Sequence, residues 1–241
     1  MSKTAKSKAS VLICTPCYGG LVTNQYLTSI LDTVTQFHAQ QVPHGVFTLA
    51  NESLISRGRN RCAQAALAGG FDKLLFIDAD IGWKWSDVAR LLKSYKKVIG
   101  GTYPIKQLSP VLALNALPEH HEIFGRERNP EALRNLGEQQ GNQTGEVEVR
   151  HIPTGFMLID CSVLRALQPH VPSFKLSSTT SDEKATQYFD YFPVRVVDEV
   201  YESEDWAFCS LVREHLDCGV WVNTNIITTH TGTHIFTGEQ Q

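Results

Sequence analysis

The chain has 241 residues, 42% of them hydrophobic and 20% charged, and its 22 basic and 25 acidic side chains give a net charge of −3. This is an ordinary globular composition, which offers no electrostatic argument for binding nucleic acid or a membrane surface. The apolar runs are too short to span a bilayer, and residues 1–10 lack a signal peptide's apolar centre. We therefore expect a cytoplasmic protein with a disordered tail at 1–10 and one domain at 11–241.

The first part of the chain alternates between short apolar runs and helical patterns. Strands are predicted at residues 11–14, 46–49 and 74–77. Helices are predicted at residues 24–40 and 54–68, where apolar side chains recur three and four positions apart. This β-α-β-α-β order predicts a parallel sheet with right-handed crossovers.

Two carboxylates directly follow the third predicted strand. Asp78 and Asp80 stand where the apolar run of residues 74–77 ends, and ligands of such sheets bind at the carboxyl ends of strands. Neighbouring acids repel each other and raise one pKa unless a positive charge joins them. Mg²⁺ or Mn²⁺, which bind carboxylate and phosphate oxygens, would supply that charge. For an isolated Asp-x-Asp, a turn whose acids only cap the next segment is the alternative.

The second predicted helix has a basic start. Arg57 and Arg61 are four residues apart and share a helix face. Helix N-termini and guanidinium groups both suit phosphate. Because this helix begins at the same sheet edge as the two acids, we predict that Arg57 contacts a phosphate, with a solvated basic face as the alternative.

Cys14 and Cys17 have the Cys-x-x-C spacing of redox motifs. In such a motif the first cysteine opens a helix and the pair stands clear of the strand. Here Cys14 lies within a predicted strand, and Gly19 and Gly20 disfavour an immediate helix. A redox role is therefore disfavoured.

The rest of the chain is less regular. Residues 119–145 are charged and rich in Asn, Gln and Gly, which predicts an excursion of loop and short helix. The alternation over residues 146–150 indicates an edge strand, and the polar stretch 177–186 predicts a mobile loop. The remaining predicted elements are helices at 85–94, 161–167 and 203–216 and strands at 97–101, within 152–160 and at 219–222.

Three further motifs lie in this part. Gly155 precedes a buried strand, where it could let the backbone approach a ligand or simply form a bulge. Glu204 and Asp205 open a helix, and they could serve as a general base or only complement the helix's positive end. His230, or else His234, could complete a metal shell beside the two acids, although a lone histidine is often inert.

Six motifs thus follow one another along the chain, and together they resemble the nucleotide-sugar glycosyltransferases of the GT-A fold. The resemblance extends over about residues 11–237, and its helix–strand–histidine ending is also similar to the polypeptide N-acetylgalactosaminyltransferases. Small proteins of this pattern also occur in bacteriophages. The implied fold is a single Rossmann-like α/β domain, with a mostly parallel central sheet flanked by helices. The motifs are Thr15-Pro16, Ser56-Arg57-Gly58-Arg59-Asn60, Asp78-Ala79-Asp80, Pro153-Thr154-Gly155-Phe156, Glu204-Asp205-Trp206 and His230-Thr231-Gly232.

The resemblance also implies roles for individual residues. Mn²⁺ or Mg²⁺ would be held by Asp78, Asp80 and His230, and Asp78 could also face the donor ribose. Asp205 or Glu204 would deprotonate the acceptor in an inverting reaction, or orient it in a retaining one. The donor-binding residues that it implies are Thr15, Pro16, Asn51, Glu52, Arg57, Asn60, Asp78 and Gly155.

The implied activity is transfer of a hexosyl or pentosyl group from a nucleoside diphosphate sugar, with UDP favoured, to an acceptor hydroxyl. The acceptor could be a glycan, a protein, a small molecule or modified nucleic acid, in the host cytoplasm if the gene is a phage gene, and the oligomeric state stays open. One alternative is a sugar-phosphate nucleotidyltransferase, although residues 17–24 lack the basic residue of its Gly-rich loop. The other alternative is a non-catalytic protein that binds nucleotide sugars. The chain lacks the Gln-x-x-Arg-Trp motif of processive synthases and a lectin domain, so the substrate does not carry over.

Overall fold

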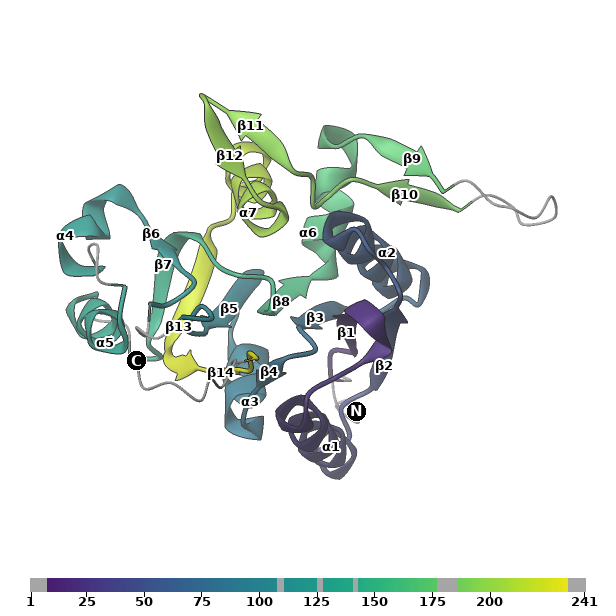
Figure 1. Ribbon diagram of the computed structural model, residues 1–241, viewed down its shortest axis with the longest axis horizontal. Helices are drawn as coiled ribbons and strands as arrows, with labels where there is room; N and C mark the ends of the chain where they lie inside the picture. Colours follow the sequence, from purple (N-terminus) through teal and green to yellow (C-terminus); the bar gives the residue numbers. More distant parts are fainter. Residues whose placement is uncertain (1–7, 108–110, 125–127, 141–142, 177–185, 234–241) are drawn as a thin grey trace, which may run out of the picture.

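The computed structural model describes residues 8–107, 111–124, 128–140, 143–176 and 186–233. These residues form an eight-stranded sheet in the order β2-β1-β3-β8-β5-β13-β7-β6, with helices on both faces (Figure 1). In that order the strands are β2 (His44–Ala50), β1 (Val11–Cys17), β3 (Lys73–Ile77), β8 (Phe156–Asp160), β5 (Val98–Thr102), β13 (Val220–Ile227), β7 (Glu146–His151) and β6 (Asn115–Ala116).

Most strands of this sheet run in one direction. β1 is parallel to both β2 and β3, as the β-α-β-α-β order predicts. β8 is antiparallel to β3 and to β5, so β5 points the same way as β3. β13 is parallel to β5, β7 is antiparallel to β13, and β6 is antiparallel to β7. Within the described sheet only β8 and β7 run against the others, which confirms a mostly parallel α/β sheet flanked by helices.

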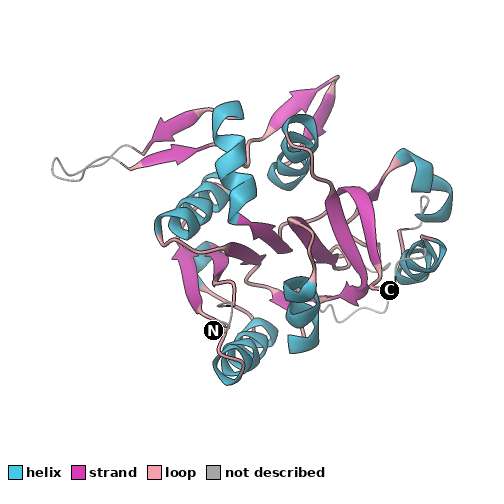
Figure 2. Cartoon of the chain, turned by 180° about the vertical axis from the view of Figure 1, so that it is seen from behind, coloured by secondary structure: helices cyan, strands magenta, loops and turns pink. Residues whose placement is uncertain are grey.

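The helices divide between the two faces because strand side chains alternate. Val11 and Ile13 of β1 belong to a core with α1 and α3, whereas Leu12 and Cys14 belong to a core with α2, α6 and α7. Figure 2 shows both layers from behind the sheet. The helices are α1 (Asn24–Ala39), α2 (Ile55–Ala68), α3 (Trp85–Lys93), α4 (His121–Phe124), α5 (Pro130–Gln139), α6 (Cys161–Leu167) and α7 (Glu204–His215), with 3-10 turns η1 (Tyr18–Gly20), η2 (Pro118–His120) and η3 (Gln168–His170).

Three small strand pairs surround the sheet. The hairpins β9 (Ser173–Lys175) with β10 (Gln187–Phe189), and β11 (Arg195–Val197) with β12 (Val200–Glu202), project past α6 and α7 (Figure 1). The third pair joins distant segments: β4 (Ile81–Gly82) follows the two acids, and it pairs with β14 (Thr229–His230). This third pair brings the last described segment to the end of β3.

The sequence pattern was wrong about one edge. β7 was expected at the edge of the sheet, but the short strand β6 pairs with its outer side. β6 contains only Asn115 and Ala116, too few residues to show a period-two pattern. Residues 1–7 of the expected tail, residues 177–185 of the expected mobile loop and His234 lie outside the described residues. Ser10 is fixed by Asp72, whose Oδ2 accepts hydrogen bonds from its backbone N (2.7 Å) and Oγ (2.8 Å).

Both cysteines of the Cys-x-x-C spacing are buried in β1. The Cys14 thiol donates to the Cys62 carbonyl oxygen at 3.8 Å, and the Cys17 thiol donates to the Thr15 carbonyl oxygen at 3.4 Å. Burial raises the pKa of both thiols, which disfavours the reactive thiolate. This arrangement supports the expectation that the pair has no redox role.

Candidate functional site

The two carboxylates after β3 lie in one tight turn but face different partners. The backbone N of Asp78 donates to the Gly155 carbonyl oxygen (3.0 Å), and the backbone N of Ile81 donates to the Asp78 carbonyl oxygen (3.1 Å). These bonds tie the turn to the segment before β8. Asp78 then points toward α2, whereas Asp80 points toward residues 104–106 and β14.

Asp78 is held by a buried arginine that the sequence did not single out. Nη2 of Arg59 donates to Oδ1 of Asp78 at 2.6 Å, and its Nε lies 3.9 Å from Oε1 of Glu204. Arg59 is 1% exposed and stacks over the Phe76 ring. Burial opposes its charge, yet the carboxylates of Asp78 and Glu204 outweigh burial and hold the pKa of Arg59 above its usual value. Arg59 therefore links the end of β3 to the start of α7.

Asp80 has two partners, both distant in sequence. Nζ of Lys106 lies 2.5 Å from its Oδ2, and Nε2 of His230 lies 3.6 Å from the same oxygen. Burial alone would raise the pKa of Asp80, but the contacts from His230 and Lys106 lower it to about 2. The carboxylate is therefore ionised throughout the physiological range.

The ring of His230 is oriented for its second nitrogen to accept. Nδ1 lies 2.9 Å from the Pro104 carbonyl oxygen, and because a carbonyl can only accept, Nδ1 carries the proton. Nε2 faces Asp80: it donates to the carboxylate when the ring is protonated, and it has a lone pair for a cation when the ring is neutral. The Tyr103 ring packs against the imidazole with centroids 4.8 Å apart. A hydrogen bond from one ring nitrogen to a carbonyl is the usual support of a metal-binding histidine.

Asp78 and Asp80 also form one wall of an open cleft of about 440 Å³. Pro16 and Ala79 lie beside them, and Tyr18, Leu21, Val22, Thr23 and Ile55 complete the lining. Tyr18 and Leu21 are 81% and 76% exposed. The cleft thus has an acidic wall and an apolar rim.

Several residues expected to bind the donor have partners within the protein. Oγ1 of Thr15 is buried and lies 2.7 Å from the Tyr26 hydroxyl. The Asn60 amide donates to Oδ1 of Asp190 (2.7 Å) and accepts from the backbone N of Phe192 (3.2 Å). Thr15 thus fixes β1 to α1, and Asn60 fixes α2 to the segment after β10.

Glu52 and Arg57 are bound to each other. Nη2 of Arg57 donates to Oε1 of Glu52 at 2.6 Å, and Nη1 of Arg61 lies 3.6 Å from Oε2. The hydrogen bond from Arg57 is the main cause of a lowered pKa at Glu52. Asn51 precedes this group in a left-handed conformation (φ 59°). Arg57 and Arg61 do share a face, as predicted, and that face carries Glu52.

Gly155 is required by close packing. A Cβ on this residue would lie 2.4 Å from the Tyr103 hydroxyl oxygen, a distance that real Cβ atoms do not adopt. Burial raises the pKa of Tyr103, so its hydroxyl stays protonated. Gly155 thus lets Tyr103 reach the space between Asp78 and His230.

The start of α7 presents the two expected catalytic carboxylates in different environments. Burial, and next the charge of Asp205, raise the pKa of Glu204. Asp205 is hydrogen-bonded through Oδ1 to the Ser203 hydroxyl and to the backbone N of Trp206. Glu204 therefore faces Arg59, whereas Asp205 is bound to Ser203 and Trp206 within the first turn of α7.

Three residues near the acids were missed by sequence reasoning: Arg59, Lys106 and Tyr103. Arg59 could have been found, because it occupies the buried stripe of α2 with Cys62, Ala63 and Ala66, and a charge on such a stripe needs a buried partner. For Lys106 and Tyr103 no local signal exists. Within the part of the chain that the structure describes, no three His, Cys, Asp or Glu side chains gather as a metal site, because Asp78 turns to Arg59.

The described helices include none that is both long and apolar enough to cross a membrane. Neither a protein-family model nor a curated protein matches the sequence. Among solved structures, the chain is similar to A197 from STIV, with 12% identity, a TM-score of 0.47 and coverage of 95% of this chain and 98% of that chain. It is also similar to S. aureus TarS 1-349, with 14% identity, a TM-score of 0.44 and coverage of 92% of this chain and 60% of that chain. For GalNAc-T7 with UDP, GalNAc and Mn²⁺, the identity is 10% and the TM-score is 0.44, with coverage of 95% of this chain and 44% of that chain. Identities and TM-scores this low assign no function.

Proposed function

We propose that this chain is a metal-dependent glycosyltransferase that uses a nucleoside diphosphate sugar, with UDP as the favoured nucleotide. The observation that supports this most is the pair formed by Asp80 and His230 beside an open cleft. An ionised carboxylate and the Nε2 of an imidazole converge there, 3.6 Å apart. That distance is too long for a hydrogen bond, and an oxygen and a nitrogen so placed suit a borderline cation such as Mn²⁺.

The donor set fits a cation shared with a diphosphate, because two protein ligands leave other positions for phosphate oxygens. When bound, the cation would neutralise charge on the leaving diphosphate. Asp80 and His230 would hold it, and Asp78 would stand beside it, positioned by Arg59. The exposed rings and side chains at the rim, Tyr18 and Leu21, would cover the base. Thr15, Asn51, Glu52, Arg57 and Asn60 would shape the surrounding segments, Pro16 would border the donor in the cleft, and Gly155 would make room for Tyr103.

Glu204 is the better of the two candidate bases. Its raised pKa makes it the stronger proton acceptor once ionised, and Arg59 keeps it near the acidic wall. We propose that Glu204 accepts the proton of the acceptor hydroxyl or orients that hydroxyl, and that Asp205 holds the first turn of α7. The six cysteines are free thiols, which fits the proposed cytoplasmic location.

The test is turnover with a panel of nucleoside diphosphate hexoses and pentoses, with Mn²⁺ or with EDTA. We expect metal-dependent release of the nucleoside diphosphate, even where water replaces the acceptor. Release of pyrophosphate from a nucleoside triphosphate and a sugar phosphate would instead identify a nucleotidyltransferase. Saturable binding with no turnover of any donor, across candidate acceptors, would leave the non-catalytic binding protein.

Lys106 should compete with the metal ion for Asp80. Its Nζ occupies the same Oδ2 that faces His230, so an entering cation must displace it. We expect Lys106→Met to bind Mn²⁺ about fivefold more tightly without nucleotide, since a part-exposed ion pair is worth up to about 1 kcal/mol. Mn²⁺ titration followed by electron paramagnetic resonance measures this, with Lys93→Met on the exposed side of α3 as the control. Unchanged or weaker affinity in Lys106→Met would place the metal elsewhere.

A further inference from the structure

A second cavity, of about 530 Å³, opens beside the start of α7. It lies between β6, β7, α4 and β12, and its lining includes Arg128, Arg150, Phe124 and Trp206. It combines aromatic and cationic side chains in a concave space, which is typical of a site for a small charged ligand.

Its two arginines have no carboxylate partner among the residues that the structure describes. Within the described residues, neither Arg128 nor Arg150 forms an ion pair or a side-chain hydrogen bond, whereas Arg57, Arg59, Arg195 and Arg213 each contact a carboxylate. Arg150 is exposed and Arg128 is half-buried. Two guanidinium groups on one cavity are therefore available to an anion, which their planar donors can bind in bidentate fashion.

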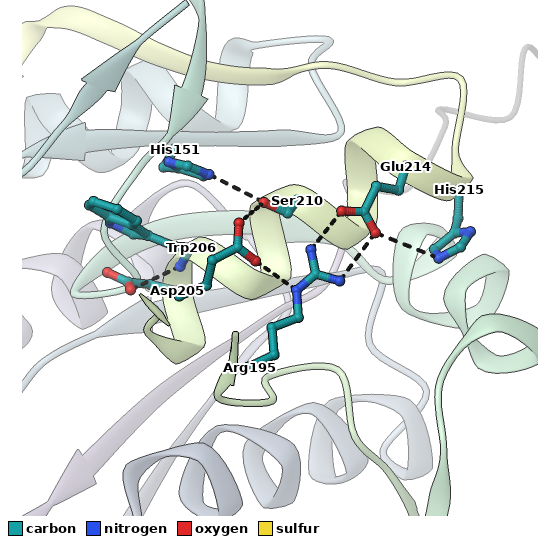
Figure 3. A network of polar contacts seen from close by, with 8 residues as sticks. His151, Arg195, Asp205, Trp206, Ser210, Glu214 and His215 are labelled. Carbon is teal, nitrogen blue, oxygen red and sulfur yellow. Dashed lines mark hydrogen bonds and ion pairs between the residues drawn. The ribbon is translucent and has the colours of Figure 1, made fainter. Parts of the chain in front are cut away.

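Among the described residues of the lining the one carboxylate, Glu202, is bound by other side chains. Its Oε2 accepts from Nε of Arg195 at 2.6 Å and its Oε1 accepts from Oγ of Ser210 at 2.8 Å (Figure 3). Arg195 also donates to both oxygens of Glu214. Both oxygens of Glu202 are therefore engaged by Arg195 and Ser210, and within the described residues neither pairs with Arg128 or Arg150.

The Trp206 ring lines the cavity and is held in place by His151, which is hydrogen-bonded to Ser210. The His151 ring stacks on the indole with centroids 4.9 Å apart and an angle of 7° (Figure 3). Nε2 of His151 lies 3.3 Å from Oγ of Ser210, and Nδ1 of His151 lies 3.4 Å from Nδ2 of Asn115. One proton arrangement satisfies all these contacts: Asn115 donates to a neutral His151, His151 to Ser210, and Ser210 to Glu202. Burial agrees, since it lowers the pKa of His151 to about 4.

The first turn of α7 joins this cavity to the proposed catalytic groups. Trp206 faces the cavity, and its backbone N donates to Oδ1 of Asp205 at 2.9 Å. Glu204, one residue before Asp205, faces Arg59 and through it Asp78. A ligand on Trp206 would therefore lie at the first turn of α7, the turn that also carries Glu204, but on the other side of that turn from Arg59.

We propose that this cavity binds a phosphate group carried by the acceptor, with Arg128 and Arg150 on the phosphate and Trp206 against the rest of the molecule. Two unpaired guanidinium groups match a doubly charged phosphate monoester better than a singly charged carboxylate. The assignment of this ligand as the acceptor rests on the proposed function, whereas the binding of phosphate does not.

The test uses inorganic phosphate and glycerol 3-phosphate as probes on the whole protein, with glucuronate as the carboxylate comparison. We expect saturable, millimolar binding that changes the tryptophan fluorescence in the parent protein but not in Trp206→Phe. Arg128→Met and Arg150→Met should each weaken it about tenfold. Arg90→Met, an exposed arginine on α3, should have no effect, and circular dichroism checks that each variant is folded.

Equal affinity for glycerol 3-phosphate in the folded double variant Arg128→Met, Arg150→Met would overturn the site. Glucuronate binding as tightly as glycerol 3-phosphate would overturn the choice of phosphate. Nucleoside diphosphate sugar binding is measured in parallel with Mn²⁺. If the double variant retains donor binding but loses the phosphate probes, the two sites are separate as proposed. If the parent protein binds the phosphate probes but no donor, the proposed function fails and the anion site stands.

Discussion

Replacing Asp80 with asparagine is expected to remove metal-dependent nucleotide binding. The change keeps the size of the side chain but removes the charge that faces Lys106 and His230. Loss of a group that merely supports a metal ligand costs 10–100-fold in affinity, so loss of a ligand should cost about 100-fold or more. Calorimetric titration of UDP with and without Mn²⁺ measures the effect, with Asp32→Asn on the exposed side of α1 as the charge-matched control.

The fold should survive this change. The pKa of Asp80 is lowered to about 2 in the folded protein, so its charge contributes stability that is complete above its unfolded pKa near 4 and is lost as the pH falls toward 2. Lys106 is half-exposed, which reduces the contribution through solvent screening to about 1 kcal/mol at pH 7. Metal-dependent binding of parent affinity in Asp80→Asn would refute the assignment.

Replacing Arg59 with methionine is expected to cause the largest loss of stability. Arg59 is buried, and without it Asp78 and Glu204 face each other with no cation between them. Breaking a buried ion pair by removing one partner costs about 3–5 kcal/mol. Chemical denaturation at pH 7 measures the free energy of unfolding, and Arg90→Met on the surface of α3 serves as the control.

The pH dependence separates this electrostatic account from a simple packing defect. In Arg59→Met the folded-state pKa values of the two carboxyls rise above their unfolded values near 4. The penalty is then complete above the raised pKa values and shrinks as the pH falls toward 4, where both groups are protonated. We expect a smaller difference from the parent protein at pH 5 than at pH 7. An equal difference at both pH values would mean that lost packing dominates. Arg59→Lys keeps the charge, so its free energy of unfolding should lie between those of the parent protein and Arg59→Met.

The local patterns of the sequence predicted the helices and strands better than they predicted which side chains contact one another. The position of Asp78 and Asp80 follows from an apolar run that ends in acids, and α7 follows from its helical spacing. The contacts of these side chains join residues that are far apart in the sequence. Arg59 and Asp78 are separated by 19 positions, Asp80 and Lys106 by 26, and Pro104 and His230 by 126. No period of 2 or 3.6 residues encodes such separations.

The same limit explains the choice of Arg57 over Arg59. Both lie in one basic stretch, and phosphate chemistry alone cannot rank them. The helix direction decides: position 57 faces Glu52 at the surface, whereas position 59 faces the core together with Cys62 and Ala63. The antiparallel insertion of β8 between β3 and β5 was likewise not visible, because a buried strand has the same apolar run in either direction.

The pairing of β4 with β14 sets when the acidic wall acquires its histidine during biosynthesis. Thr229 and Gly82, which this pairing joins, are 147 residues apart. At about 5–20 residues per second, roughly 7–30 s separate the synthesis of the two segments. The β1–β3 half is synthesised first and can fold first, since its three strands lie within residues 11–77. Until β14 docks, however, the nascent chain offers Asp80 without His230. The growing polypeptide is thus expected to bind manganese and nucleotide only weakly, and docking of β14 is expected to be a late event in refolding, because contacts between distant segments form slowly.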